Sequence, residues 1–476
     1  MNNLTSHAYS TSRGLSVGSR DVEKFLDPAD KPRDVGISGA LLTNFFLSIV
    51  ILFCTLSVQA QRIELVLWHG MAGHLGDEVQ LLADDFNHSQ NEYFVKPVYK
   101  GNYVETLTSF AAAFRAHQPP AIVQIFEVGT AIMLSPKGVI KPVDELMREQ
   151  QLSLPEADFI QSIREFYSRN GRLMALPFNL SAPTLYYNRD ILAKVGYSSV
   201  NFPRTWDQME DLAKKIKKAG YECTYTTAYP GWILFESYLA IHGLPLTQGN
   251  PPRAAFDTPA LANHFKRLQR WNAQGYFRYG GRVDDATILF TSGICPLFSQ
   301  SSGAYNSLSA LVPFRLGVAS MPLDIQASKV RHANVAGGAA LWAVYGQTKE
   351  HYKGIAEFFV FITKPETQKR WHEHTGYLPV GLKGIYASIV QTSHHPTLLL
   401  AQADLEDNLH EKPLKYMGPE NQIRSVNDEV LEAMFAGLLS PGEALHEATL
   451  RVNHLLDRFA RNTKSEFYTA RQNLRL

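Results

Sequence analysis

The chain has 476 residues, of which 45% are hydrophobic and 19% are charged, and its formal net charge is +1. A chain of this length and composition is expected to fold, and it is long enough for two compact lobes with appended segments. The near-zero net charge excludes a general attraction to nucleic acid or anionic membranes. Any recognition of an anion must therefore come from a local cluster of side chains.

The amino terminus predicts export. Residues 1–35 are polar, and a basic flank at Arg33 then precedes the apolar run 39–60. Val58 and Ala60 are the small residues that signal peptidase requires at the end of such a run, so we expect a signal peptide and a periplasmic protein. An uncleaved membrane anchor is the alternative, because about 20 apolar residues can span a bilayer.

The segments after this leader predict an α/β fold. Apolar, β-branched runs at 62–68, 93–99 and 121–126 predict buried strands. Between them, 79–86 and 103–117 have the apolar periodicity of amphipathic helices. Because strands and helices alternate at short spacing, the sheet should be mostly parallel and covered by helices on both faces.

Two capping boxes predict helices further along the chain. Thr205 with Gln208 begins one helix, and Ser440 with Glu443 begins a long helix near the carboxyl end. No repeat of solenoid period and no low-complexity linker separates the predicted elements. We therefore expect two lobes joined by ordered crossings, which form a hinge.

No motif in the sequence requires catalysis. The nucleophile elbow, the H-E-x-x-H zinc motif and the phosphate-binding P-loop motif are absent. His372 and His374 are two residues apart, which on a helix points their rings in different directions and not at one metal ion. We expect no enzyme, metal or cofactor. An extracytoplasmic phosphodiester hydrolase is the alternative.

The cysteines leave two interpretations open. Cys54 falls in the apolar leader, so Cys223 and Cys295 remain, and their spacing fits neither a metal finger nor a redox motif. In an oxidising compartment they could form one disulfide. Two buried free thiols fit the sequence equally well.

Several islands of polar residues occur in an order that identifies a family. On these segments the chain resembles the extracytoplasmic family 1 solute-binding proteins of ABC importers, and within that family the members that bind sn-glycerol-3-phosphate. The resemblance extends over nearly all of residues 62–460. The segments are 99–103, 124–130, 176–183, 185–188, 301–303, 337–342, 371–379 and 422–424.

The resemblance implies a fold and a mode of action. The fold is α/β, the two-lobed periplasmic-binding-protein fold of type II found in maltose-binding protein, with the ligand cleft between the lobes. By chain order, we expect 61–180 and 338–366 in lobe 1, and 181–337 and 367–476 in lobe 2. The protein would close on its ligand as a monomer and dock on a permease driven by a cytoplasmic ATPase.

The resemblance also carries cleft residues over to this chain, one position at a time. Trp232 matches one of two tryptophans that pack against the glycerol moiety, and Tyr229 replaces the second. Cys223 and Cys295 match cysteine positions of the family, which implies a shared structural role. The positions that match cleft-lining residues are Tyr103, Glu127, Ser181, Ser301, Gly338, Tyr377 and Arg424.

The chemistry of these residues suits a phosphorylated polyol. Arg424 offers a forked, charge-assisted donor to phosphate. Glu127 would repel phosphate but can accept hydrogen bonds from hydroxyl groups. We therefore expect capture of sn-glycerol-3-phosphate. A glycerophosphodiester such as glycerophosphocholine is the near alternative because of Tyr229, and an oligosaccharide is a further one.

Three of these residues have a structural alternative. Arg424 could pair with Asp428 or Glu429 on the surface of its helix. Glu127 could cap a helix, and Trp232 could belong to the apolar core.

Overall fold

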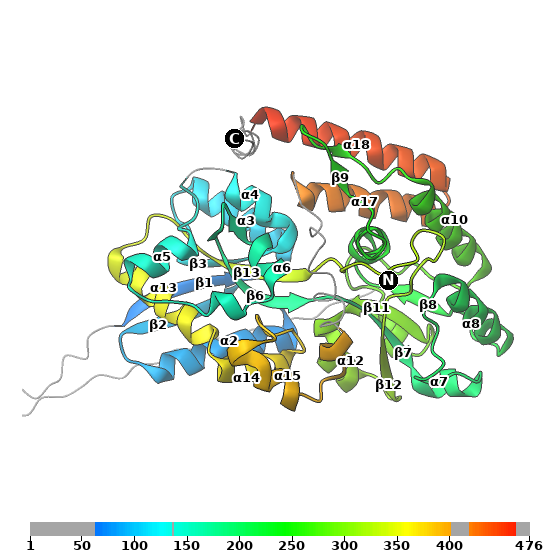
Figure 1. Cartoon of the computed structure of the whole chain (residues 1–476), viewed down its shortest axis with the longest axis horizontal. Helices are drawn as coiled ribbons and strands as arrows, with labels where there is room; N and C mark the ends of the chain where they lie inside the picture. The colour runs from blue at the N-terminus through cyan, green and yellow to red at the C-terminus, as the bar shows by residue number, and fades with distance from the viewer. Residues whose placement is uncertain (1–61, 136–137, 401–417, 463–476) are drawn as a thin grey trace, which may run out of the picture. The chain divides into compact units, whose positions relative to one another are not determined.

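The computed structural model describes residues 62–135, 138–400 and 418–462 (Figure 1). The polar extension and the expected signal peptide, residues 1–60, lie outside these ranges.

Five strands form the first sheet, in the order β2-β1-β3-β13-β6. Strands β1 (Ile63–His69), β2 (Tyr93–Tyr99) and β3 (Ile122–Phe126) run parallel and confirm the three predicted strands. Strand β13 (Gly337–Ala343) comes from far along the chain and pairs antiparallel with β3 and with β6 (Leu176–Ser181). The prediction of a mostly parallel sheet is therefore only partly right, because the two pairings that β13 makes are antiparallel and the other two are parallel.

Helices cover both faces of this sheet, as the alternation predicts. Helix α2 (Gly73–Ser89) follows β1, and α3 (Tyr103–Arg115) follows β2 behind a capping box formed by Asn102 and Glu105. The two helices lie on opposite sides of the sheet in Figure 1, because successive right-handed crossovers in opposite directions alternate between the faces. Helix α13 (Lys349–Ile362) packs against β1.

Four strands form the second sheet, in the order β12-β7-β11-β8. Strand β7 (Pro183–Asn188) pairs antiparallel with β11 (Leu297–Ser301) and β12 (Leu316–Ser320). Strand β8 (Tyr225–Thr227) lies parallel to β11 at the edge.

The helices around the second sheet include the two helices that the capping boxes predict. Helix α8 (Trp206–Lys218) begins behind Thr205, and α18 (Pro441–Asn462) begins behind Ser440. Helix α10 (Pro259–Gln274) and helix α17 (Glu420–Phe435) pack against α18 and against each other.

The remaining elements are short. They are α4 (Thr130–Leu134), α5 (Val143–Glu149), α6 (Gln161–Phe166), α7 (Arg189–Lys194), α9 (Ser237–Ile241), α11 (Thr287–Thr291), α12 (Tyr305–Leu311), α14 (Pro365–Thr375), α15 (Ala387–Thr392), strand pairs β4–β5 (Ser168–Arg169, Arg172–Leu173) and β9–β10 (Thr247–Gln248, Arg253–Ala254), and five single-turn or π-helical segments, η1 (Glu127–Gly129), η2 (Glu156–Asp158), η3 (Gly231–Glu236), η4 (Ser302–Ala304) and η5 (Gly384–Tyr386).

Each sheet has its own apolar core. We call the first sheet with the elements packed on its core the first half of the molecule, and the second sheet with the elements packed on its core the second half. A single residue, Ala182, separates β6 of the first sheet from β7 of the second. The sequence-based boundary at residue 367 differs from the structure, because the apolar side chains of α14 and of 377–398 belong to the first core. Helix α14 packs on α2, with the ring of Trp371 4.6 Å from that of Phe178.

Candidate functional site

Arg424, on α17 of the second half, contacts carboxylates from both halves. Its Nε and Nη2 donate to the two oxygens of Glu236, over 2.9 and 2.5 Å. Its Nη1 donates to Oε1 of Glu127 over 2.6 Å. The side chains are 15% (Arg424), 2% (Glu236) and 7% (Glu127) exposed. We call these three residues the Arg424 cluster.

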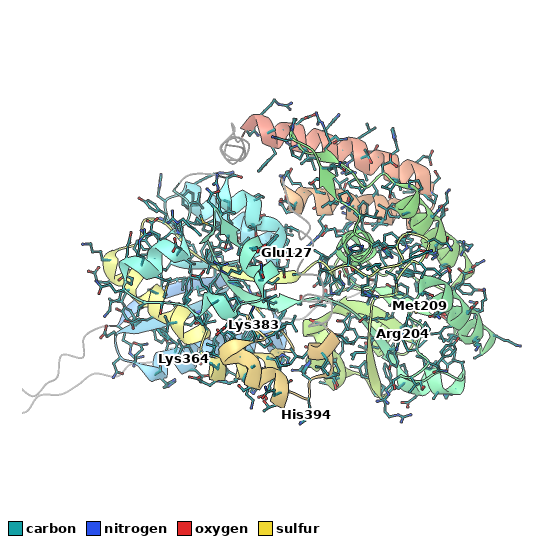
Figure 2. All side chains as sticks on the ribbon, viewed as in Figure 1. Glu127, Arg204, Met209, Lys364, Lys383 and His394 are labelled. Atoms are coloured by element: carbon teal, nitrogen blue, oxygen red, sulfur yellow. A yellow bond between two sulfur atoms is a disulfide. The ribbon has the colours of Figure 1, made fainter. Side chains whose placement is uncertain are left out.

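Two different helical turns bring the carboxylates to Arg424. Glu127 opens η1 directly after β3, where the carboxyl end of a strand meets the edge of the sheet. It is labelled in Figure 2. Glu236 ends η3, a π-helix, which is a rare form that often occurs at functional sites.

The surface pairing considered for Arg424 is replaced by this buried arrangement. Asp428 Oδ1 accepts a hydrogen bond from the backbone N–H of Gly231 over 2.7 Å. Glu429 pairs with Arg451 on α18 and lies 3.8 Å from Arg282. Both carboxylates that Arg424 would have met on its own helix therefore have other partners.

The surroundings of Arg424 contain more carboxyl groups than cations. Burial raises the pKa of Glu127, although Arg424 opposes this shift. Burial also raises the pKa of Asp428 to about 7 and that of Glu420 to about 8. Neither carboxyl oxygen of Glu420 has a hydrogen-bond partner within the part of the chain that the structure describes. The local charge balance is thus unusual for a buried site.

Tyr103 and Tyr377 lie in a buried polar network of the first half. Asn179 Nδ2 donates to the Tyr103 hydroxyl over 2.6 Å, and Gln124 Nε2 donates to Asn179 Oδ1 over 2.9 Å. The Tyr103 ring stacks on Phe126, with centroids 5.5 Å apart. Burial raises the pKa of Tyr103, and the nearby phenol of Tyr377 raises it further, so both phenols stay protonated donors.

Gly338 and Ser181 lie on the paired strands β13 and β6. Gly338 has a φ of +106°, and a Cβ there would lie 1.7 Å from the carbonyl oxygen of Asn179. Only glycine fits this position. Ser181 pairs with Gly337 in the β13–β6 register, and it is buried.

Ser301 belongs to the second half, where β11 ends. Its Oγ accepts a hydrogen bond from the backbone N–H of Gly303 over 3.1 Å. A Cβ at Gly303 would lie 2.7 Å from the ring of Tyr377. The turn that Ser301 caps therefore packs directly on a predicted site residue of the first half.

Tyr229 and Trp232 form an aromatic corner at the start of η3. Their ring centroids are 6.4 Å apart at 75°, and Tyr229 has a φ of +44°, which is rare for a non-glycine residue. A Cβ at Gly337 would lie 2.4 Å from the Trp232 ring, so the indole packs on strand β13 of the first half. Trp232 Nε1 has no hydrogen-bond partner among the described residues.

The contacts above place the nine predicted residues in three groups near the junction of the two halves. These are Arg424 with Glu127; Tyr103, Tyr377 and the turn of Ser301; and Tyr229 with Trp232 against strand β13, which holds Gly338 and pairs with Ser181. Glu236 is a further residue of this site that was not predicted from the sequence, although its position carries a signal. Residues 231–236 read Gly-Trp-Ile-Leu-Phe-Glu, so Glu236 is an acidic residue within an otherwise apolar run next to Trp232. A carboxylate in such a run requires a buried partner.

Of the two interpretations of Cys223 and Cys295, the structure supports a disulfide and not two free thiols. Cys223 and Cys295 form a disulfide with an S–S distance of 2.09 Å and a Cα–Cα distance of 4.7 Å. The bond lies within the second half and joins the segment before β8 to the segment before β11.

His372 and His374 do not share a metal ion. His372 is buried, and its ring nitrogens face the carbonyl oxygen of Tyr377 and the hydroxyl of Ser393. His374 lies 3.3 Å from Glu78. Among the described residues, no group of three or more His, Cys, Asp or Glu side chains could hold a metal ion.

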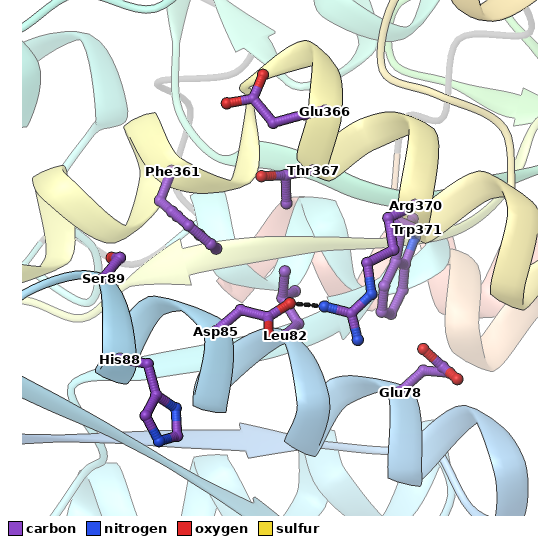
Figure 3. Close-up of a pocket in the computed structure, with 10 residues that line it drawn as sticks. All are labelled: Glu78, Leu82, Asp85, His88, Ser89, Phe361, Glu366, Thr367, Arg370 and Trp371. Atoms are coloured by element: carbon purple, nitrogen blue, oxygen red, sulfur yellow. Dashed lines mark ion pairs between the residues drawn. The ribbon is translucent and has the colours of Figure 1, made fainter.

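A surface pocket of about 520 Å³ lies between α2 and α14 (Figure 3). Leu82, Phe361 and Trp371 form its apolar part, and Asp85 pairs with Arg370 across it. None of the nine predicted residues lines this pocket.

Comparison with protein families identifies the class of protein. Residues 82–396 match the bacterial extracellular solute-binding protein family, and the chain belongs to this family. The fold is the two-lobed, maltose-binding-protein-like α/β fold. No helix in the described ranges is long and apolar enough to cross a membrane.

Among individual relatives, the sn-glycerol-3-phosphate-binding periplasmic protein UgpB of Yersinia pseudotuberculosis is 37% identical over 87% of this chain and 97% of the relative. UgpB of Escherichia coli K12 is 37% identical over 84% of this chain and 93% of the relative. These relatives are periplasmic binding proteins by name.

Two solved structures show the same fold. UgpB from Mycobacterium tuberculosis in complex with glycerophosphocholine superposes with a TM-score of 0.69, 20% identity, and coverage of 84% of this chain and 99% of the other. Maltose-bound T. maritima MalE3 superposes with a TM-score of 0.70, 17% identity, and coverage of 83% and 100%.

Proposed function

We propose that this protein is the solute-binding component of an ABC import system and that it captures sn-glycerol-3-phosphate for delivery to a permease. The observation that carries the proposal is Arg424, whose guanidinium is buried at the junction of the two halves and faces carboxylates from both. The relatives at 37% identity are named for binding sn-glycerol-3-phosphate, and a guanidinium stabilises a phosphate that leaves water.

The phosphate of the ligand is bound by Arg424 and by neutral donors around it. A phosphate dianion that leaves water needs its lost hydrogen bonds replaced, and a guanidinium supplies the strongest of these. The hydroxyls of Ser181 and Ser301, the protonated phenol of Tyr377 and the backbone N–H of Gly338 complete the set.

The glycerol moiety is bound by Glu127 and Trp232. One guanidinium cannot balance two carboxylates and a phosphate dianion, so ligand entry has to separate Glu127 from Arg424. Glu127 is then available to accept hydrogen bonds from the glycerol hydroxyls. The indole of Trp232, which already packs on β13, provides the apolar wall for the carbon skeleton.

Contacts from both halves explain why binding closes the molecule. Glu127 and Tyr103 belong to the first half, and Arg424 and Trp232 belong to the second. A ligand that contacts all four binds the closed form more tightly than an open form, which is the condition for closure.

A glycerophosphodiester such as glycerophosphocholine is the second candidate ligand. Two observations favour it: Tyr229 stands where the family resemblance expects a tryptophan, and Glu127 and Glu236 place two carboxylates on the single guanidinium of Arg424. A cationic head group would offset their charge, whereas the phosphomonoester dianion would not.

A titration series tests both candidates. The purified protein is titrated by calorimetry with sn-glycerol-3-phosphate, glycerophosphocholine, maltose and inorganic phosphate. We expect binding of the first or the second and none of maltose. A ligand at about 100 times its Kd should also stabilise the fold by about 2.7 kcal/mol. Binding of maltose alone would refute the proposal, and release of choline from glycerophosphocholine would establish a hydrolase.

Export and assembly complete the proposal. A signal peptide ending at Ala60 directs the chain to the periplasm, and the protein acts there as a monomer without a cofactor. Amino-terminal sequencing of the secreted protein tests the cleavage site, since a first residue of Gln61 is expected.

A further inference from the structure

Glu236 is the most buried carboxylate that contacts Arg424. Its side chain is 2% exposed, and both of its oxygens accept hydrogen bonds from the guanidinium, one from Nε and one from Nη2. This is the forked, two-point geometry that fixes the plane of a guanidinium as well as its position.

The two carboxylates on Arg424 differ in where they come from. Glu236 belongs to η3, which packs against α17 in the second half, so it moves together with Arg424. Glu127 comes from the first half and contacts only Nη1. When the halves separate, the Glu236 contact is therefore retained and the Glu127 contact is broken.

A second contact fixes η3 on α17. The backbone N–H of Gly231, the first residue of η3, donates to Asp428 Oδ1 over 2.7 Å. A Cβ at Gly231 would lie 2.6 Å from that same oxygen and 3.3 Å from the carbonyl of Arg424, so the close approach requires glycine. The two ends of η3 are thus attached to α17 at positions four residues apart.

We propose that Glu236 is a positioning residue. It holds the guanidinium of Arg424 by Nε and Nη2 so that Nη1 points toward the first half, at the place where Glu127 is now and where the ligand phosphate binds. The inference rests on the proposed function, because it assigns the phosphate to Arg424.

The physical reason is preorganisation. A free arginine side chain has many rotamers, and ordering it on ligand binding would weaken affinity. A guanidinium already held by Glu236 through both Nε and Nη2 loses little further freedom. It also cannot follow Glu127 when the halves separate, so one N–H group remains directed at the cleft.

The test compares Glu236→Gln with Glu429→Gln, a matched change of a half-exposed carboxylate on α17. Glutamine keeps the size of Glu236 but offers only one acceptor oxygen and no charge. By calorimetry, affinity for sn-glycerol-3-phosphate should fall about 10- to 100-fold in Glu236→Gln and less than about 2-fold in Glu429→Gln. Glu236→Asp, which keeps the charge but shortens the reach, is the second variant if Glu236→Gln does not fold.

A double-mutant comparison separates positioning from a purely structural role. Lysine at position 424 keeps a charge but cannot take the forked contact. In an Arg424→Lys background, Glu236→Gln should therefore lower affinity less than about 2-fold further. A structural role would give the same loss in both backgrounds and would overturn the inference.

A spectroscopic readout applies even without ligand. In the wild-type protein, the Arg424 Nε–H resonance should be resolved and slow to exchange with solvent, and in Glu236→Gln it should exchange fast. Unchanged exchange, or wild-type affinity of Glu236→Gln, would overturn the inference alone. Failure of the wild-type protein to bind either glycerophosphate ligand would overturn the proposed function together with it.

Discussion

Two buried arginine–carboxylate clusters in this protein differ in a way that separates structure from function. In the second half, Arg267 pairs with Asp324 over 2.6 Å, and Asp324 also accepts hydrogen bonds from the Tyr238 hydroxyl and the backbone N–H of Gln326. Every member of this Arg267 cluster belongs to one half, and the buried carboxylate is fully hydrogen-bonded.

The Arg424 cluster has the opposite properties. It joins the two halves, both carboxylates on its guanidinium are buried, and Glu420 nearby has no hydrogen-bond partner for its carboxyl group in the described ranges. A balanced, one-sided cluster serves stability, whereas a surplus of charge across a junction is tolerated where a ligand is to be bound.

The largest loss of stability is expected for a substitution in the Arg267 cluster. Asp324→Ala leaves Arg267 buried without its main partner, so we expect the free energy of unfolding to fall by about 3–5 kcal/mol. Asp207→Ala removes the other, exposed carboxylate near Arg267 and should cost about 0–1 kcal/mol. Urea denaturation measures both. Equal losses in the two variants would show that the buried carboxylate of Asp324 stabilises the fold no more than the exposed one of Asp207.

The carboxyl group of Glu420, near the Arg424 cluster, should make the stability of the protein depend on pH. Burial raises its pKa from 4.5 to about 8, so the folded protein keeps this proton over a range in which the unfolded chain loses it. Below pH 4.5 Glu420 is protonated in both the folded and the unfolded state and does not change the free energy of unfolding. As pH rises from there toward 8, this group lowers the free energy of unfolding by about 1.4 kcal/mol per pH unit. Between pH 5 and 7 the loss from this group is about 3 kcal/mol.

Glu420→Gln should remove this loss, because the amide does not titrate. Urea denaturation at pH 5 and at pH 7 measures the difference, which should be smaller in the variant than in the wild-type protein. An identical pH dependence in the two proteins would show that Glu420 is ionised in the folded state.

Gly337→Ala tests the apolar part of the junction. The added Cβ would lie 2.4 Å from the Trp232 ring, so the indole must move. We expect a loss of about 1–3 kcal/mol in stability together with weaker ligand binding. The control is Gly442→Ala in α18. A Cβ there would have no neighbouring atom within 4 Å, so this change should be neutral or slightly stabilising. Normal ligand affinity of Gly337→Ala would argue against Trp232 as the wall of the site.

Local patterns in the sequence predict much of the fold. The three apolar runs gave β1, β2 and β3, and the capping boxes at Thr205 and Ser440 gave the starts of α8 and α18. These features depend on residues close together in the chain. The antiparallel insertion of β13 and the packing of α14 on α2 depend on contacts between distant segments, which periodicity does not encode.

The site divides in the same way. Individual residues such as Arg424 and Gly338 could be matched to positions of a known family, and simple chemistry separated the roles of Arg424 and Glu127. The sequence could not show that these two side chains, 297 residues apart, form an ion pair. It also gave no direct sign that Glu236 holds the same guanidinium, because a carboxylate in an apolar run does not name its partner.

The most direct test of the central claim is calorimetric titration of Arg424→Ala with sn-glycerol-3-phosphate or, if the wild-type protein prefers it, glycerophosphocholine. Arg451→Ala, which removes a half-exposed arginine paired with Glu429, is the control. We expect Arg424→Ala to weaken binding by about 2–5 kcal/mol, because the phosphate loses its buried cation, and Arg451→Ala to bind normally. Equal affinity of Arg424→Ala and the wild-type protein would contradict it.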